Sequence, residues 1–337
     1  MAQPLVCIGS YTPATGGRGS GITVCAQDPA TGVLTPLGEP TATPSPSFLA
    51  AHPDGRTLYA VNELEPQGTL SAFAIADDGS LTPLGSVPSG GSAPCHVAVD
   101  PTGAYALTAN YGDGRVSVHP LAPNGAAGPH TTVVELHGDG PDRDRQAGPH
   151  AHQVAFDGDT VLVCDLGSDR VWRYRLRPDG TLVAEAPVPT PPGFGPRHLV
   201  HTAPDRAWVV GELVPAVRAL PNGPATGLAT AGPTRNHPSA IVASPDGRHL
   251  YVANRGPDTV TVLALDGGTP RVVAEIDTGV TWPRDATLIG DHLYIAGERS
   301  DTVTALRRDP ATGLLAPPAE ALTTGTPTCI AAVPRTY

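Results

Sequence analysis

Apolar and polar residues alternate in short runs along this chain, and turn residues bound each run. The fullest example is GPHAHQVAFDGDTVLVCDLG at 148–167, which opens with Pro149, alternates briefly, turns at Asp157-Gly158 and rises through an apolar run to Asp165. Alternation with a period of two, and short apolar runs between turn residues, are typical of β-strands. No segment sustains a helical period. The pattern therefore predicts an all-β protein.

The 148–167 pattern recurs along the chain at intervals of 42 to 55 residues between opening prolines, by subtraction of their numbers. The opening prolines of the seven copies, the last of them the truncated PTCIAAV at 327–333, are Pro46, Pro94, Pro149, Pro196, Pro238, Pro283 and Pro327. Each copy is followed by two more β runs joined by a turn, as in the DPATG turns at 28–32 and 309–313. Four short strands in roughly 45 residues correspond to one propeller blade. We therefore predict a single domain, residues 1–337, folded as a seven-bladed β-propeller.

The two ends of the chain carry complementary parts of one repeat. Residues 5–11 match the second strand of the other copies but have no first strand before them, whereas 327–333 supply a first strand with nothing after it. Joining the ends of the chain in one sheet closes a propeller. The closing blade is therefore expected to take strands from both termini.

Composition narrows the class of partner and the compartment. The net charge is −11 and no run of Lys or Arg occurs, which argues against nucleic acid and anionic membranes as partners. No stretch of about 18 apolar residues could span a bilayer, and the N-terminus lacks the basic start and apolar core of a secretory signal. The five cysteines are odd in number and scattered through apolar runs, so we expect buried, reduced thiols and a cytoplasmic protein.

Candidate chemistry follows from aligning the copies, because the first strand of every propeller blade lines the central channel. The first residues after the opening prolines are Ser47, Cys95, His150, Arg197, Ser239, Arg284 and Thr328. The second residues are Phe48, His96, Ala151, His198, Ala240, Asp285 and Cys329. The second strands end in Asn62-Glu63, Asn110-Tyr111, Asp165, Glu212, Asn254-Arg255 and Glu298. His150 and His152 lie two apart in an expected strand, so both imidazoles should face the same way.

A ring of His, Arg and Glu residues at one end of a channel suits a reaction site. Two guanidinium groups can hold a carboxylate or phosphate, or stabilise an oxyanion, and a histidine or glutamate can move a proton. The alternative is structural: Arg197 and Arg284 would form ion pairs that tie blades together, and His96 and His198 would only hydrogen-bond.

Other chemistries fit the sequence less well. His150 and His152 could ligate a metal, but two nearby arginines disfavour a cation, so we predict no metal and no cofactor. The GGRGSG run at 16–21 lies between strands and opens no helix, unlike a phosphate-binding loop. Cys95 lacks a known Cys–His signature, and no G-x-S-x-G elbow occurs.

Several motifs, in order and correctly spaced, resemble those of a known family. They are IGSYT at 8–12, GPHAH at 148–152, GPRHLV at 195–200, GEL at 211–213, HPSAIVASPDGRHLYVANRG at 237–256 and WPRD at 282–285. On these residues the whole chain resembles the seven-bladed propeller lactonases, which include bacterial 6-phosphogluconolactonases and the fungal carboxy-cis,cis-muconate lactonizing enzyme.

The resemblance implies a metal-independent lactone hydrolase of the pentose phosphate pathway, acting on a sugar lactone such as 6-phosphoglucono-δ-lactone. The catalytic residues it implies are His150 or His152, Arg197, Glu212 and Arg284, and we expect His96, His198 and Asp285 to bind substrate. The expected state is a monomer or weak homo-oligomer. Two alternatives stay open: a muconate-type lactonizing isomerase, and a non-catalytic propeller that binds a protein, although aromatic residues, at 4%, are scarce for such an interface.

Overall fold

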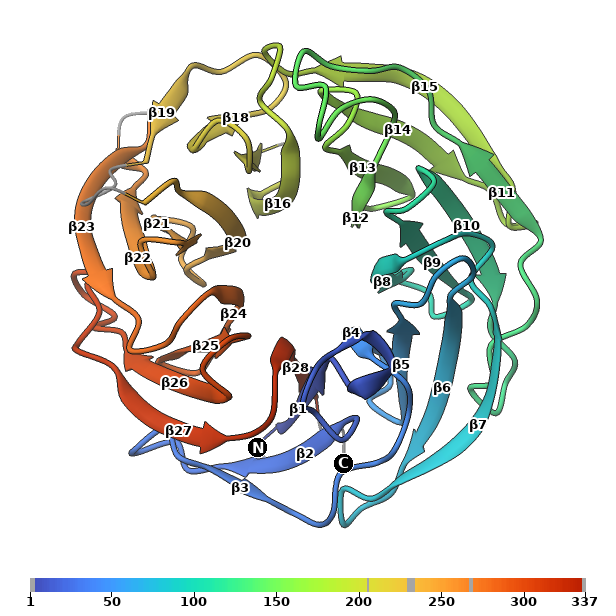
Figure 1. The fold of residues 1–337 in the computed structure, drawn as a ribbon, viewed down its shortest axis with the longest axis horizontal. Coiled ribbons are helices and arrows are strands. Elements are labelled where there is room, and N and C mark those ends of the chain that lie inside the picture. The colour runs from blue at the N-terminus through green and yellow to red at the C-terminus, as the bar shows by residue number, and fades with distance from the viewer. Residues whose placement is uncertain (1–3, 205, 229–233, 267–268, 335–337) are drawn as a thin grey trace.

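A computed structural model describes residues 4–204, 206–228, 234–266 and 269–334. Within these ranges the strands form seven antiparallel sheets of four strands each, arranged as blades around a central channel (Figure 1). The predicted seven-bladed β-propeller is therefore confirmed. Nowhere in the described ranges is there a helix both long and apolar enough to cross a membrane.

Each blade runs outward from the channel through its four strands. The innermost strands are β4 (Pro46–Ala51), β8 (Pro94–Val99), β12 (Ala151–Asp157), β16 (Pro196–Ala203), β20 (His237–Ala243), β24 (Pro283–Ile289) and β28 (Pro327–Val333). The second strands are β5 (Thr57–Asn62), β9 (Tyr105–Asn110), β13 (Thr160–Asp165), β17 (Arg206–Gly211), β21 (His249–Arg255), β25 (His292–Gly297) and β1 (Leu5–Ser10). The third strands are β6 (Thr69–Ile75), β10 (Arg115–Pro120), β14 (Arg170–Leu176), β18 (Ala216–Ala219), β22 (Thr259–Ala264), β26 (Thr302–Arg307) and β2 (Thr23–Gln27). The outermost strands are β7 (Leu81–Pro88), β11 (Thr132–Glu135), β15 (Leu182–Pro189), β19 (Ala225–Gly227), β23 (Arg271–Asp277), β27 (Ala319–Thr323) and β3 (Leu34–Pro36), and a 3₁₀ turn, η1, spans Pro13–Thr15.

The second strands are continuous apolar runs because they are covered on both faces. Every residue of β1, β5, β21 and β25 is buried. In β1, Leu5 and Cys7 pack against Leu49 of the next blade, while Val6 and Ile8 pack against the preceding blade. Strands buried on both faces lose the polar alternation of one-sided strands, so the hydrophobic core lies between the blades.

The closing blade has the order β28-β1-β2-β3, and β1 pairs with β28 from Leu5 opposite Val333 to Ser10 opposite Pro327. Figure 1 shows the two ends of the chain in this one blade. Asp285 of the neighbouring blade accepts the backbone N–H of Ile330 at 2.8 Å, which ties β24 to β28. The predicted closure by both termini is confirmed, and all five cysteines are buried and free, as predicted.

The alignment of the third copy, which opens at Pro149, needs a correction. In β4, Pro46 pairs with Asn62, and in the equivalent place Ala151, not Pro149, pairs with Asp165. Asp165 accepts the N–H of His150 at 2.8 Å, which holds His150 just before the strand. The prediction that His150 occupies the position of Arg197 and Arg284 is therefore wrong, because His152 occupies it.

Candidate active site

One end of the channel, here called the mouth, gathers the side chains at the starts of the innermost strands. Its inner ring consists of Ser47, Cys95, His152, Arg197, Ser239, Arg284 and Thr328. Six of these, with Phe48, His198 and Asp285, line a cavity of about 10 Å³, the inner cavity, which suits roughly one water-sized atom.

Several buried polar atoms around the inner cavity lack a hydrogen-bond partner among the described residues. They are Ser47 Oγ, Thr328 Oγ1, His152 Nδ1, and Nε and Nη1 of Arg197. Buried polar groups in folded proteins are nearly always hydrogen-bonded. Guanidinium nitrogens can only donate, and hydroxyls can donate as well. The inner cavity is thus suited to an oxygen atom that carries negative charge.

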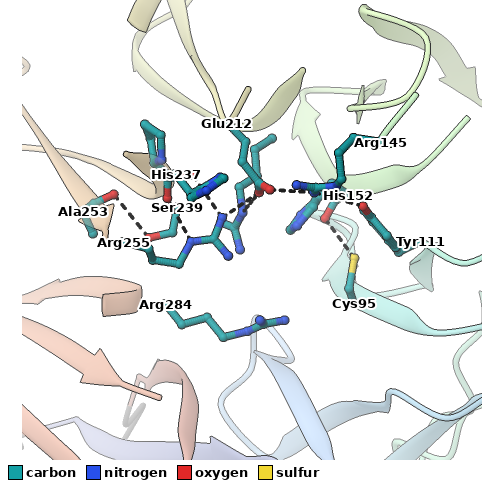
Figure 2. Close-up of polar contacts among 12 residues, drawn as sticks. Cys95, Tyr111, Arg145, His152, Glu212, His237, Ser239, Ala253, Arg255 and Arg284 are labelled. Atoms are coloured by element: carbon teal, nitrogen blue, oxygen red, sulfur yellow. Dashed lines mark hydrogen bonds and ion pairs between the residues drawn. The ribbon is translucent and has the colours of Figure 1, made fainter. Parts of the chain in front are cut away.

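An outer ring is formed by residues at or just after the ends of the second strands, including Tyr11, Glu63, Tyr111, Glu212, Arg255 and Glu298. Glu212 contacts three arginines (Figure 2). Glu212 Oε1 accepts from Arg145 Nη2, and Oε2 accepts from Arg255 Nη2, both at 2.7 Å. Arg197 Nε lies 3.1 Å from the same Oε2, outside hydrogen-bond geometry.

The Glu212 cluster, which is Glu212 with Arg145, Arg197 and Arg255, has two more positive than negative charges, three guanidinium groups against one carboxylate. Burial alone would raise the pKa of Glu212, but the charges of Arg255, Arg197 and Arg145 outweigh it and lower that pKa. Burial, and next the charge of Arg255, lowers the pKa of Arg197 to about 9. The three guanidinium groups leave a positive surplus beside one carboxylate, so this side of the mouth attracts anions.

Arg284 forms the centre of a second group, the Arg284 cluster with Tyr11, Glu63 and Glu298, and Figure 2 shows Arg284 apart from Glu212. Its Nη1 lies 3.0 Å from Glu298 Oε2, and its Nη2 lies 2.5 Å from Tyr11 Oη and 3.7 Å from Glu63 Oε2. The guanidinium also stacks 4.8 Å from the Tyr11 ring centre. Burial opposes its charge, but Tyr11 and the two carboxylates more than offset that effect and raise the pKa of Arg284.

The two histidines of GPHAH have different surroundings. His150 is half-buried, stacks on Tyr111 with 4.4 Å between ring centres, and its Nδ1 lies 2.8 Å from the Tyr111 carbonyl oxygen. Because a carbonyl only accepts, Nδ1 donates, and the lone pair of the neutral ring is on Nε2. His152 is buried, and burial with the charges of Arg197 and Arg284 lowers its pKa well below the ordinary value.

His96 and His198 are the second residues after the opening prolines of β8 and β16. With Phe48 and His152 they form a chain of edge and tilted ring contacts across the channel. Burial and the charge of Arg197 lower the pKa of His96 to about 3 and that of His198 well below its ordinary value. Within the described ranges, no three His, Cys, Asp or Glu side chains are grouped to hold a metal.

The structure thus brings His152, Arg197, Arg284 and Glu212 together, with His150 at the rim of the mouth. His198 and Asp285 line the inner cavity, and His96 contacts the ring of His198. A substrate-binding role for these three stays a prediction. Sequence reasoning did not select Arg145, Arg255 or Tyr11. Arg255 and Tyr11 could have been found, because both take the position that Glu212 takes at its second strand.

Comparison with known proteins adds three findings. The sequence model of the family "Lactonase, 7-bladed beta-propeller" matches residues 5–332. A 6-phosphogluconolactonase of Bacillus subtilis is 34% identical over 257 residues, 72% of this chain and 73% of the relative. The solved structure of a periplasmic gluconolactonase of Pseudomonas aeruginosa is 31% identical, with a TM-score of 0.91 over 99% of both chains.

Proposed function

The chain belongs to the seven-bladed β-propeller lactonase family, and we propose that it hydrolyses the ester bond of a sugar lactone at the channel mouth. Water would add to the lactone carbonyl, and the ring C–O bond would break to release the open-chain hydroxy acid. Such a reaction builds negative charge on the carbonyl oxygen, and donors placed where that charge develops accelerate it.

The observation that carries the proposal is the set of unpartnered donors around the inner cavity. Arg197, whose Nη1 has no partner, and the unpartnered hydroxyls of Ser47 and Thr328 line a space of about 10 Å³, which suits one oxygen atom. We assign this space to the carbonyl oxygen of the lactone. Arg284 lines the same cavity, so two guanidinium groups would stabilise the oxyanion.

We assign the general base to His150. Glu212 is a poor base because arginines occupy both carboxylate oxygens and lower its pKa. His152 is a poor base because its protonated form would be buried beside Arg197 and Arg284. His150 keeps the Nε2 lone pair, which would take a proton from the attacking water, and the resulting imidazolium would return it to the departing ring oxygen.

The names of the relatives support the substrate class. Curated relatives from Bacillus subtilis and Formosa agariphila are named 6-phosphogluconolactonase, and the Pseudomonas aeruginosa neighbour is named a gluconolactonase. We propose 6-phosphoglucono-δ-lactone as the substrate of this chain. We also propose that it acts in the cytoplasm, as a monomer or weak homo-oligomer, without nucleic acid or membrane partners.

A panel of lactones, assayed by proton release at constant pH, tests this proposal. It would contain 6-phosphogluconolactone, glucono-δ-lactone and muconolactone, each corrected for spontaneous hydrolysis in buffer. We expect the two sugar lactones to be hydrolysed and muconolactone to be inert. Turnover of muconolactone alone would assign the protein to lactonizing isomerisation, and no turnover of any lactone would refute the proposal.

A further inference from the structure

Arg145 differs from the other arginines of the mouth in its origin. It lies in residues 136–150, which connect β11 to β12, whereas residues 89–93 and 278–282 suffice for the same connection elsewhere. It therefore has no counterpart in the repeat. A side chain outside the repeat that still reaches the mouth is a candidate for a role particular to this protein.

The connection holds Arg145 in a fixed place. The side chain of Gln146, which is wholly buried, donates to Leu166 O and to Asp169 Oδ1, both at 2.8 Å. Gln146 Oε1 accepts from the N–H of Asp142 at 3.2 Å, and the Asp142 carbonyl accepts the N–H of Gln146 at 2.6 Å. The turn that contains Arg145 is thus closed by its own hydrogen bonds and anchored to the turn that follows β13.

Only part of the Arg145 guanidinium is used within the protein. Its Nη2 donates to Glu212 Oε1 at 2.7 Å and to Tyr111 Oη at 3.3 Å, as Figure 2 shows. Nε and Nη1 donate to no side chain or carbonyl of the described residues, and neither is enclosed. Three of the five N–H groups of this guanidinium are therefore available to a ligand.

Exposure separates Arg145 from the other three arginines. Its side chain is 35% exposed, against 3% for Arg197 and 8% for Arg255 in the same cluster, and 17% for Arg284. The Glu212 cluster carries two surplus positive charges, whereas the Arg284 cluster has two carboxylates for one guanidinium. An anionic group of a ligand would therefore bind on the Glu212 side, and Arg145 is the arginine it can reach.

We propose that Arg145 is a specificity-determining residue that binds an anionic group carried by the substrate outside its lactone ring. This inference rests on the proposed function and adds the recognition of a phosphate or carboxylate. A guanidinium with a free fork holds such groups with two parallel hydrogen bonds. Arg145 would act in binding rather than in bond breaking, because Arg197 and Arg284, and not Arg145, line the inner cavity where the carbonyl oxygen would bind.

Comparison of R145Q with wild type on two lactones tests the proposal. We expect KM for 6-phosphogluconolactone to rise about tenfold or more, since each charge-assisted hydrogen bond contributes strongly, with kcat within about twofold. The kcat/KM for glucono-δ-lactone, which has no charge, should fall much less than that for the phosphorylated lactone, because only the phosphorylated lactone loses a charged partner. R143Q is the matched control, because Arg143 lies in the same connection but is 79% exposed and, within the described ranges, pairs only with Asp139.

Three results would overturn the proposal: an equal loss on both lactones, a fall in kcat alone, or an unchanged KM for the phosphorylated lactone.

If R145Q does not fold, R145K keeps the charge without the fork and should still raise KM for the phosphorylated lactone. Calorimetric binding of 6-phosphogluconate and gluconate needs no turnover. Selective loss of 6-phosphogluconate binding in the variant would support Arg145 even if the protein hydrolyses no lactone, and equal binding would refute it.

Discussion

Arg197 and Arg284 are expected to act through the geometry of their guanidinium groups. Both line the inner cavity, where the oxyanion would form, and lysine would keep the charge but lose the planar fork. We predict that Arg197→Lys and Arg284→Lys fold normally and lower kcat/KM roughly 100-fold, about 3 kcal/mol of transition-state stabilisation. Lactonase kinetics beside thermal unfolding would check this, and a folded double variant with wild-type rates would refute the site assignment.

The two histidines of GPHAH should differ in the pH dependence of the rate. If His150 is the base, His150→Gln should flatten the acid limb of the kcat/KM profile. His152→Gln should retain that limb whatever its effect on the rate, because His152 stays neutral across it. Profiles from pH 5 to 8 would distinguish them, and an acid limb unchanged in His150→Gln would exclude His150 as the base.

At the scale of the element, strands were easier to predict than their exact alignment. The second strands could be located because burial on both faces makes each a continuous apolar run, as in β5 and β25. The offset at Pro149 could not be seen, because it depends on Asp165 accepting the N–H of His150. The aligned proline at 149 therefore located the blade, but it did not identify which histidine takes the position of Arg197 and Arg284 in the channel.

The residues of the mouth that the sequence did not reveal fall into two kinds. Tyr11 follows β1 as Glu63 follows β5, so the repeat alignment contained the information that places Tyr11 beside Arg284. Arg145 has no such counterpart, and its place depends on how Gln146 fixes a single connection. Repeats thus reveal the positions that all blades share, and they cannot reveal a residue supplied by one insertion.

Strand β28 should be indispensable, because it completes the closing blade. Cys329, Ile330 and Val333 are each at most 3% exposed, and burying such side chains contributes about 1.5–3 kcal/mol each. Their sum approaches the whole stability of a typical domain, about 5–15 kcal/mol, and loss of β28 would also open an edge of β1. We predict that deleting residues 327–337 abolishes cooperative unfolding in a denaturant titration.

Ile330→Val is the control for that deletion, because it removes one methylene and keeps the strand. It should cost only about 0.5–1.5 kcal/mol and leave a single cooperative transition. A truncated protein that still unfolds cooperatively near the wild-type midpoint would show that the other blades close without β28.

For the whole molecule, the channel histidines contribute strongly to how stability depends on pH. Burial lowers the pKa of His96 to about 3 and those of His152 and His198 well below their ordinary values. Below about pH 6.5 the unfolded chain would bind protons at these three sites while the folded protein would not. The folded state is therefore fully stable above that pH and loses stability as the pH falls through this window.

Asp285 acts in the opposite sense, because burial raises its pKa to about 6. Between about pH 6 and 4 the folded protein would hold a proton there that the unfolded chain releases, which offsets one histidine. Burial also lowers the pKa of His119 to about 4, so three uncompensated histidines at about 1.4 kcal/mol per pH unit each give a loss of up to about 4 kcal/mol per pH unit below pH 6. Urea titrations at pH 8, 7, 6 and 5 would measure it, with His96→Gln expected to reduce the slope by one proton. A free energy of unfolding that is constant from pH 7 to 5 would mean that these histidines become charged without disturbing the channel.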